Sequence, residues 1–310
     1  MVEAWKEEKL KKSQYRVVGN HSAVKVCLWT KEALRGGRSC YKNTFYNIDT
    51  AGCLEMSPAL TCNQRCSYCW RDNSLFSKEW DGPVDEPDDI ITGCIEERKK
   101  LLQGFGGNDK TNREFYREAL EPKQVAISLT GEPCMYPKLP GLIDKFYGRG
   151  FKSVFLVTSG TVPEMLKKFN RLPTNLYISL TASNPEMHKR LCLPVIDGAW
   201  EKLLESLEIM STLKTDTVIR LTLIKGLNMD NPKEFIPLIE KAKPKYVEAK
   251  AYMFLGYSRQ RLKQENMPSH SEVKEFAEFL EKNSNYKIVN ERVDSRVILL
   301  ERKSVKAKQP

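Results

Sequence analysis

Short apolar runs alternate with amphipathic stretches along most of this chain, and this alternation limits the folds that it can adopt. Six runs are short enough for buried strands, namely 52–58, 124–130, 151–157, 175–180, 218–224 and 246–252. The stretches between them have helical periodicity, as where Ile90, Ile91 and Cys94 share one face. Strands that alternate with helices pair in parallel through right-handed crossovers. We therefore predict an α/β fold, an incomplete (β/α)6 barrel of the TIM type.

The predicted barrel leaves a segment of the chain on each side. We expect residues 1–48 to form an N-terminal extension, residues 49–256 the barrel, and residues 257–310 a C-terminal extension. No apolar run is long enough to cross a bilayer. The first nine residues are charged and unlike a signal peptide, so a cytoplasmic location is expected.

The chain carries 50 Lys and Arg against 40 Asp and Glu, a formal net charge of +10. Such an excess suggests a polyanionic partner, most simply nucleic acid. A solvated surface rich in Lys and Glu explains the charge equally well. Composition alone therefore leaves the partner open.

Three of the nine cysteines, Cys62, Cys66 and Cys69, follow the first predicted strand with the spacing C-x3-C-x2-C. Clustered cysteines in a reducing compartment indicate metal or redox chemistry. A structural zinc site normally needs a fourth protein ligand, and no Cys or His follows closely enough to supply it. Three thiolates instead suit a [4Fe–4S] cluster that leaves one iron open to a small ligand.

The segment from Cys62 to Cys69 resembles the signature of the radical S-adenosylmethionine (SAM) superfamily, in which an aromatic residue, here Tyr68, precedes the last cysteine. The resemblance implies that the open iron binds the amino and carboxylate groups of SAM. It also implies that an electron from the cluster cleaves SAM to methionine and a 5′-deoxyadenosyl radical. The motif would lie at the C-terminal mouth of the barrel, where barrel active sites are found.

Loops after other predicted strands support this interpretation. Gly131, Glu132 and Pro133 follow the second strand and resemble the family's Gly-Glu-Pro segment, which receives the SAM amino group. Ser179 and Thr181 end the fourth strand and are candidates for contacts with the SAM ribose or carboxylate, although ordinary strand-end polar residues look the same. Weaker candidates of the same kind are Thr158–Gly160 after the third strand and the segment of Asn228 after the fifth.

A second set of cysteines, Cys27, Cys40 and Cys53, has twelve residues between neighbours. This long spacing is not a local motif, and three scattered buried cysteines would show it too. Against that interpretation, Cys40 lies in a polar, glycine-bearing loop. Cys53 lies only nine residues before Cys62, so we expect the two sets near each other in space.

Three evenly spaced cysteines ahead of a radical SAM motif resemble the wyosine-forming tRNA enzymes, the 4-demethylwyosine synthases. The similarity spans most of the chain and includes residues 36–42, 130–133, 257–262 and 266–270. It implies a second [4Fe–4S] cluster on Cys27, Cys40 and Cys53. It implies that pyruvate condenses with N1-methylguanosine at position 37, in the anticodon loop of tRNA-Phe, to form the tricyclic precursor of wybutosine. The reaction would make the chain a carbon–carbon lyase that acts on tRNA.

The same resemblance suggests roles for further groups. Larger relatives carry an N-terminal flavodoxin domain, so we expect this chain to receive electrons from a separate flavodoxin or ferredoxin. Lys42 is a candidate for a Schiff base with the pyruvate carbonyl. A lysine that contacts tRNA phosphates is the alternative for that position.

Binding of tRNA requires phosphate contacts and a surface for an exposed base. Candidates for the phosphate contacts are Lys31, Arg35, Arg38, Arg259, Arg261 and Lys263. Candidates for stacking on the base are Tyr41, Trp70 and Tyr257. Two other functions remain open from the sequence: a different radical SAM enzyme such as a glycyl-radical activase, and a non-catalytic, zinc-containing RNA-binding module.

Overall fold

The computed structural model describes residues 4–303, and the chain divides into two compact units. The first unit comprises Met1–Gln64, Asn73–Thr158 and Glu164–Leu176. The second comprises Arg65–Asp72, Ser159–Pro163 and Tyr177–Pro310. The chain passes between the units five times, and two of these points lie within helix α7 (Pro163–Leu166) and strand β6 (Asn175–Ser179).

The first unit contains five strands and their helices. Its elements are α1 (Ala4–Lys12), β1 (Arg16–Val18), β2 (Ser22–Lys25), α2 (Leu28–Leu34), α3 (Tyr41–Tyr46), β3 (Cys53–Ser57), α4 (Pro87–Gly106), α5 (Arg113–Leu120), β4 (Gln124–Ile127), the 3-10 helix η1 (Pro133–Met135), α6 (Leu139–Gly148) and β5 (Ser153–Thr158).

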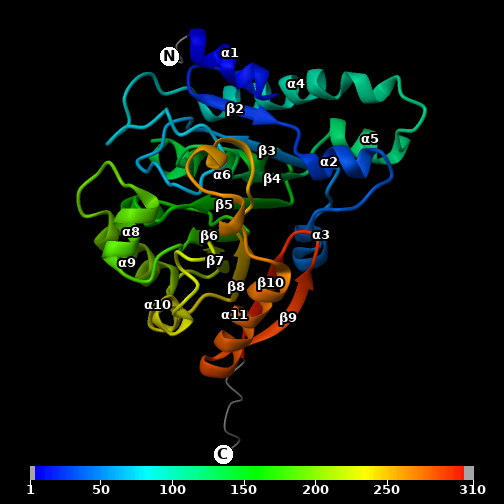
Figure 1. Cartoon of the computed structure of the whole chain (residues 1–310). Coiled ribbons are helices and arrows are strands. Elements are labelled where there is room, and N and C mark those ends of the chain that lie inside the picture. The colour runs from blue at the N-terminus through cyan, green and yellow to red at the C-terminus, as the bar shows by residue number, and fades with distance from the viewer. Residues whose placement is uncertain (1–3, 304–310) are drawn as a thin grey trace, which may run out of the picture. The chain divides into compact units, whose positions relative to one another are not determined.

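The sheet of the first unit has the order β1-β2-β3-β4-β5. Strands β3, β4 and β5 are parallel, and β1 and β2 form an antiparallel hairpin added at the edge of β3. Helix α4 packs against β1, β2 and β3 (Figure 1). Leu54 and Met56 of β3 are fully buried. Because side chains alternate along a strand, Cys53 and Glu55 lie on the opposite face.

The second unit contains the remaining elements. They are α8 (Pro185–Cys192), α9 (Ala199–Met210), β7 (Asp216–Leu223), η2 (Pro232–Phe235), α10 (Ile236–Ala242), β8 (Tyr246–Ala251), η3 (Gly256–Gln260), η4 (Gln264–Asn266), α11 (His270–Asn283), β9 (Tyr286–Arg292) and β10 (Val297–Arg302).

Within the second unit, β6 is followed in the sheet by β7, β8, β10 and β9. Strands β7 and β8 are parallel, and the hairpin β9–β10 pairs antiparallel with β8. Helix α11 packs against these last three strands (Figure 1). A capping box starts α11: Ser269 accepts from the backbone of Glu272, whose carboxylate accepts in return. The buried Glu248 is paired with Arg220 over 2.7 Å and accepts from the Tyr177 hydroxyl.

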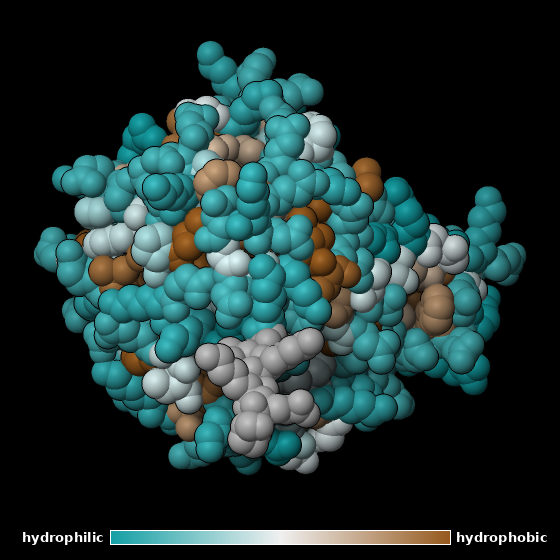
Figure 2. Space-filling view, turned by 90° about the horizontal axis from the view of Figure 1, so that it is seen from below, coloured by the Kyte–Doolittle hydropathy of each residue, from teal (hydrophilic) through white to brown (hydrophobic). Residues whose placement is uncertain are grey.

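All six predicted strands are present, at β3 to β8. The second is shorter than expected, because the chain leaves β4 after Ile127 and the N–H groups of Ser128 and Leu129 both turn to the carbonyl of Met56. The two antiparallel hairpins were not predicted. No helix among residues 4–303 could span a membrane, and the face in Figure 2 carries mostly hydrophilic side chains.

Candidate active site

Cys62 lies in a loop beyond the end of β3 that is held by backbone hydrogen bonds on both sides. Its N–H donates to the carbonyl of Leu75 over 3.2 Å, and its own carbonyl accepts from the N–H of Ser77 over 3.1 Å. Cys53 is the first residue of the same strand. Four further strand residues, at about 3.3 Å each, and four loop residues separate the two positions. Cys53 therefore begins β3, whereas Cys62 follows its other end.

The loop of Gly131 and Glu132 packs directly on the backbone that leads to Cys62. The N–H of Glu132 donates to the carbonyl of Thr61 over 2.8 Å. Gly131 has a φ of +67°, and a Cβ atom there would lie 2.0 Å from the carbonyl oxygen of Ala59 and 2.5 Å from that of Thr61. Glycine is required here both by the positive φ and by the close backbone approach.

Glu132 has its side chain buried inside this loop. Its Oε1 accepts a hydrogen bond from the Thr158 hydroxyl over 2.6 Å and one from the N–H of Cys134 over 3.0 Å. The carboxylate therefore braces the loop against the end of β5. The groups left to contact a ligand in this segment are mainly those of the backbone.

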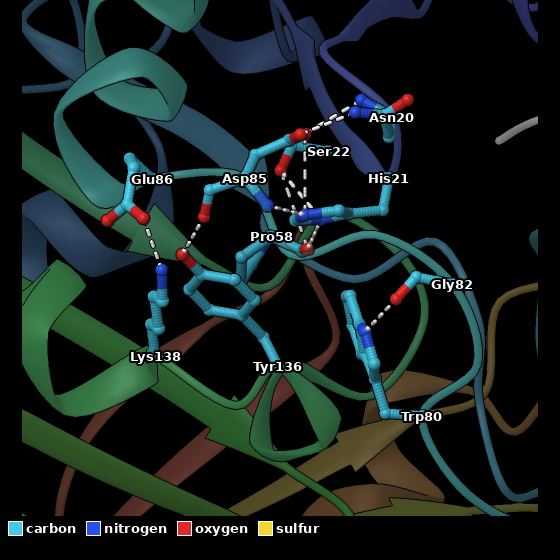
Figure 3. A network of polar contacts seen from close by, with 10 residues as sticks. All are labelled: Asn20, His21, Ser22, Pro58, Trp80, Gly82, Asp85, Glu86, Tyr136 and Lys138. Atoms are coloured by element: carbon cyan, nitrogen blue, oxygen red, sulfur yellow. Dashed lines mark hydrogen bonds and ion pairs between the residues drawn. The ribbon is translucent and has the colours of Figure 1, made fainter.

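His21, in the turn between β1 and β2, fixes the chain just before the cysteine loop (Figure 3). Its Nδ1 donates to the carbonyl of Pro58 over 2.6 Å, and its Nε2 accepts from the N–H of Asp85 over 2.9 Å. The N–H of Leu60 donates to the carbonyl of His21 over 3.0 Å. Burial lowers the pKa of His21, which favours the neutral ring that this pattern requires.

Trp80 and Tyr136 enclose the same histidine (Figure 3). The Trp80 ring meets His21 edge-on at 4.7 Å between centroids, and Tyr136 lies 5.3 Å from it. The Tyr136 hydroxyl donates to the carbonyl of Asp85 over 2.7 Å. Tyr136 directly follows η1. The cluster therefore connects both the Gly-Glu-Pro loop and the chain that leads to Cys62 to the turn between β1 and β2.

Cys66 and Cys69 lie in the second unit, in a turn docked on the end of α8. The N–H of Arg65 donates to the carbonyl of Cys192 and that of Ser67 to the carbonyl of Leu191, over 3.1 and 2.8 Å. Within the turn, the N–H of Cys69 donates to the carbonyl of Cys66 over 3.1 Å. Because main-chain atoms hold the turn in place, its two thiols can serve as ligands without loss of the turn.

Residues of η3 hold the other side of this turn. Arg261, just after η3, donates from Nε to the carbonyl of Ser67 over 3.1 Å and from Nη2 to the carbonyl of Cys69. The N–H of Tyr257 donates to the carbonyl of Trp70 over 3.0 Å. A Cβ on Gly256, where φ is +53°, would lie 2.2 Å from that same carbonyl oxygen. The cysteine turn is thus fixed by a segment almost two hundred residues later.

The thiols of this turn are largely withdrawn from water. The pKa of Cys66 is raised by a hydrogen bond with Cys192 and by desolvation, and desolvation also raises the pKa of Cys69. The Tyr68 hydroxyl lies 3.7 Å from the Cys192 sulfur and accepts from Thr181 over 2.9 Å. Desolvated thiols of this kind gain most from a bound metal, which stabilises the thiolate form.

The predicted SAM contacts of the second unit have different environments. Ser179 is half-buried at the end of β6, whereas Thr181 is buried and its hydroxyl donates to Tyr68. Asn228 is buried; its Nδ2 donates to the carbonyls of Thr181 and Thr222, and its Oδ1 accepts from the N–H of Ile224. Asn228 therefore braces the loops after β6 and β7, and both of its amide protons are already used.

The structure brings Cys27, Cys40 and Cys53 together in the first unit. Cys27 is the N-cap of α2 and Cys40 that of α3, while Cys53 begins β3. The pKa of Cys27 is raised to about 11 and that of Cys53 to about 12, mainly by desolvation, and the nearby thiol of Cys40 contributes to both increases. Thr50 joins two of these loops: its carbonyl accepts from Thr30 and its hydroxyl accepts from the N–H of Cys40.

Buried polar atoms without partners surround this second set. In the described part of the chain, Gln124 Oε1, Ser153 Oγ and Arg98 Nη1 are buried and lack a hydrogen bond. Gln124 is the strand partner of both Cys53 and Ser153, so these three side chains lie at one level on one face of the sheet. Such orphaned groups are uncommon in proteins and indicate a place for a polar group.

Between residues 4 and 303, no three Cys, His, Asp or Glu side chains converge closely enough to share one metal ion. The thiolates of a [4Fe–4S] cluster each bind a different iron, so they stand further apart than the ligands of one zinc ion.

Lys42 lies beside this second set. Its Nζ is 4.9 Å from the centre of the Phe155 ring, on the sheet face that also carries Cys53 and Ser153. The charge of Lys42 partly offsets the rise in the pKa of Cys53, so the amine lies near that thiol. Lys42 thus places an amine near the buried sheet face that carries Cys53.

The candidate tRNA contacts differ in how accessible their side chains are. Lys31 and Arg35 line a cavity of about 290 Å3 in the first unit, together with Lys11 and Arg16. Trp70 is 43 % exposed and can meet a base. Two expectations are wrong: Arg261 is occupied by the cysteine turn, and Tyr41 is only 7 % exposed and packs on Phe45, so it cannot stack on an extruded base.

Comparison with known proteins identifies two families along the chain. Residues 56–239 match the Radical SAM superfamily, and residues 241–302 match the Wyosine base formation family. A tRNA 4-demethylwyosine synthase that depends on S-adenosyl-L-methionine, from Pyrococcus abyssi, is 47% identical over 301 residues. These cover 95% of this chain and 88% of that protein.

Two solved structures are similar over almost the whole chain. A structure of TYW1 with a lysine–pyruvate adduct bound is 36% identical, with a TM-score of 0.89 over 98% of this chain and 97% of that one. The crystal structure of archaeal TYW1 is 33% identical, with a TM-score of 0.81 and 97% of each chain covered. The predicted fold class, an incomplete α/β barrel of the radical SAM type, is confirmed.

Proposed function

Since this chain belongs to the radical SAM superfamily and, within it, to the tRNA 4-demethylwyosine synthase family, we propose that it condenses pyruvate with N1-methylguanosine-37 of tRNA-Phe. Membership of the superfamily implies SAM and a [4Fe–4S] cluster. It also excludes a non-catalytic zinc module, and the family excludes a glycyl-radical activase. The substrates, the carbon–carbon lyase chemistry and the site residues below are the proposal.

The first cluster would be held by Cys62, Cys66 and Cys69. When bound, this cluster and SAM supply the 5′-deoxyadenosyl radical. The backbone of Gly131 to Pro133 would receive the amino group of SAM, since this loop packs on the chain leading to Cys62. Ser179 and Thr181 would face the ribose or carboxylate. Asn228 would keep these loops in place.

A second [4Fe–4S] cluster would be held by Cys27, Cys40 and Cys53. The N-terminal extension, residues 1–48, would thus supply Cys27 and Cys40 to this second site, and the barrel, residues 49–256, would supply Cys53. The C-terminal extension, residues 257–310, would hold the turn of Cys66 and Cys69. The orphaned atoms of Gln124 and Ser153 support a polar occupant near Cys53. Each proposed cluster would take one ligand from this part of the first unit, Cys53 at the start of β3 and Cys62 in the loop beyond its end.

The position of Lys42 is the observation that carries this proposal. The amine lies beside the second cysteine set, and a relative 36% identical to this chain binds pyruvate through a lysine. A neutral amine would attack C2 of pyruvate, and loss of water would leave an imine. The imine would hold C2 of pyruvate near the face of β3. The N1-methyl carbon, after it has lost a hydrogen atom to the 5′-deoxyadenosyl radical, would form the new bond to this C2. Pyruvate C1 would be lost as the new bond forms.

Two further partners complete the proposal. The tRNA would bind through phosphate contacts, for which the cations of the first unit that line its cavity, such as Lys31 and Arg35, are suitable. Electrons would come from an external flavodoxin or ferredoxin.

An anaerobic assay tests the function as a whole. Reconstituted protein is mixed with SAM, a reductant, pyruvate and tRNA-Phe that bears N1-methylguanosine, and the digested nucleosides are analysed by mass spectrometry. A tricyclic nucleoside that appears only with pyruvate is expected. If 5′-deoxyadenosine forms while the nucleoside stays unchanged in this complete mixture, the proposed substrates are wrong.

We predict that Lys42→Arg lowers turnover by roughly a hundredfold or more, the scale at which removal of one catalytic group acts. Arginine keeps the positive charge, but its guanidinium cannot form the imine. Borohydride with pyruvate should reduce the imine and add a stable mass to wild-type Lys42, which peptide mapping detects. Lys31→Arg, beside the same cysteine set, is the matched control. Full turnover with normal tRNA affinity in Lys42→Arg would exclude the Schiff base.

A further inference from the structure

Arg98, in the middle of α4, is an arginine with no exposed surface. Its Nε donates to the carbonyl of Ala119 over 2.8 Å, and its Nη2 donates to the carbonyl of Ala51 over 2.7 Å. Its Nη1 has no partner among the described residues. Ala51 is only two residues from Cys53, so the guanidinium lies beside the strand end that carries the second cysteine set.

A buried guanidinium without a counter-ion is costly, because its charge has left water and no anion replaces the lost hydration. Arg220, a partly buried arginine, follows the usual rule: it is paired with the buried carboxylate of Glu248 over 2.7 Å. Arg98 has only carbonyl acceptors within the described chain, and these are neutral. Asp49 and Glu55 lie near enough to favour the charged form of Arg98, but within the described chain no acidic group is bonded to it directly.

The hydrogen bonds of Arg98 indicate where a direct counter-ion would lie. Its Nη2 is bonded to Ala51, two residues before Cys53, while its buried Nη1 has no partner among the described residues, and burial lowers the pKa of Arg98. Three thiolates give a [4Fe–4S] cluster a net negative charge, which grows by one when the cluster is reduced. Such a cluster at Cys27, Cys40 and Cys53 would supply this counter-ion.

We infer that Arg98 is the buried counter-ion of the second cluster and raises the reduction potential of that cluster. The inference rests on the second cluster of the proposed function. A nearby cation stabilises the more negative, reduced cluster, so Arg98 makes reduction easier and binds the cluster more tightly. Arg98 touches no substrate; it is a positioning residue that acts through the cluster.

The test uses full-length protein in which Cys62, Cys66 and Cys69 are all alanine, so that any iron reports the second site. Arg98→Gln removes the charge and keeps a hydrogen-bond donor, whereas Arg98→Lys keeps the charge. The midpoint potential of the cluster is measured by titration followed with electron paramagnetic resonance. We expect Arg98→Gln to disfavour reduction at least tenfold, a shift of about 59 mV to lower potential for one electron. Arg98→Lys should stay within threefold.

A second readout compares apo and iron-loaded protein. The rise in Tm on loading should be smaller in Arg98→Gln than in the parent or in Arg98→Lys, because only the charged residue interacts with the cluster. Equal potentials in all three proteins would overturn the inference, as would equal shifts in both variants. Failure of apo Arg98→Gln to fold, alone or with Arg98→Lys, would also overturn it, because the polypeptide itself would then need the arginine. Absence of iron from the parent would instead refute the second cluster.

Discussion

Replacement of Gly131 by alanine is expected to lower SAM cleavage by roughly a hundredfold, the loss that a misplacement of about 1 Å in an active site produces. The added Cβ would lie 2.0 Å from the carbonyl oxygen of Ala59 and 2.5 Å from that of Thr61. Both are backbone atoms just before Cys62, so they can move only if the cysteine loop moves. The positive φ adds about 1–2 kcal/mol of strain.

The measurement is the rate of 5′-deoxyadenosine formation with dithionite and SAM, together with the iron content. Gly150→Ala is the matched control: Gly150 also has a positive φ, of +80°, yet a Cβ atom there would meet nothing within 4 Å. This control carries the backbone strain without the collision. A rate for Gly131→Ala equal to that of Gly150→Ala would show that the contact with the cysteine loop is unimportant for cleavage.

Substitutions in the two cysteine sets are expected to have different effects when one set is altered at a time. Cys62→Ala should abolish formation of 5′-deoxyadenosine and remove about half of the iron, because the first cluster then lacks one of its three ligands. Cys27→Ala should also remove about half of the iron, yet it should still cleave SAM. The Cys27→Ala variant should form no tricyclic nucleoside in tRNA, because the proposed pyruvate site is lost.

Iron analysis, electron paramagnetic resonance and nucleoside mass spectrometry on both variants check this result. Cys94→Ala is the control, because Cys94 is fully buried on α4 and serves the helix packing. If Cys27→Ala loses all of its iron, the six cysteines share a single site and the proposed division between them is wrong.

The sequence predicted the strands of the barrel well because each is a short apolar run that ends in polar or glycine residues. The hairpins β1–β2 and β9–β10 were missed for a physical reason. They are antiparallel additions whose pairing depends on the edges of β3 and β8, which a local pattern does not reveal. The run from Val297 to Leu300, with four buried apolar residues, was a usable signal for β10.

The sequence proposes the cysteines and Lys42 as site residues, but it did not predict which contacts hold them in place. Arg261 looked like one more phosphate contact, since a side chain's hydrogen bond to a turn almost two hundred residues away leaves no trace in local sequence. The buried position of Arg98, in contrast, did leave a trace in the local sequence. It lies four residues after Cys94 and four before Leu102, both fully buried, so its place on the apolar face of α4 marks it as a buried charge.

The strand β3 has a consequence for how sequences of this kind can vary. Cys53 and Cys62 are fixed at its two ends, and side chains along a strand point alternately to opposite faces. Insertion of a single residue within β3 would turn Cys53 away from Cys27 and Cys40, into the layer where Leu54 packs. Insertion of two would restore the direction and lengthen the gap by about 6.6 Å. The identity of the residues between these cysteines can therefore drift, whereas their number cannot.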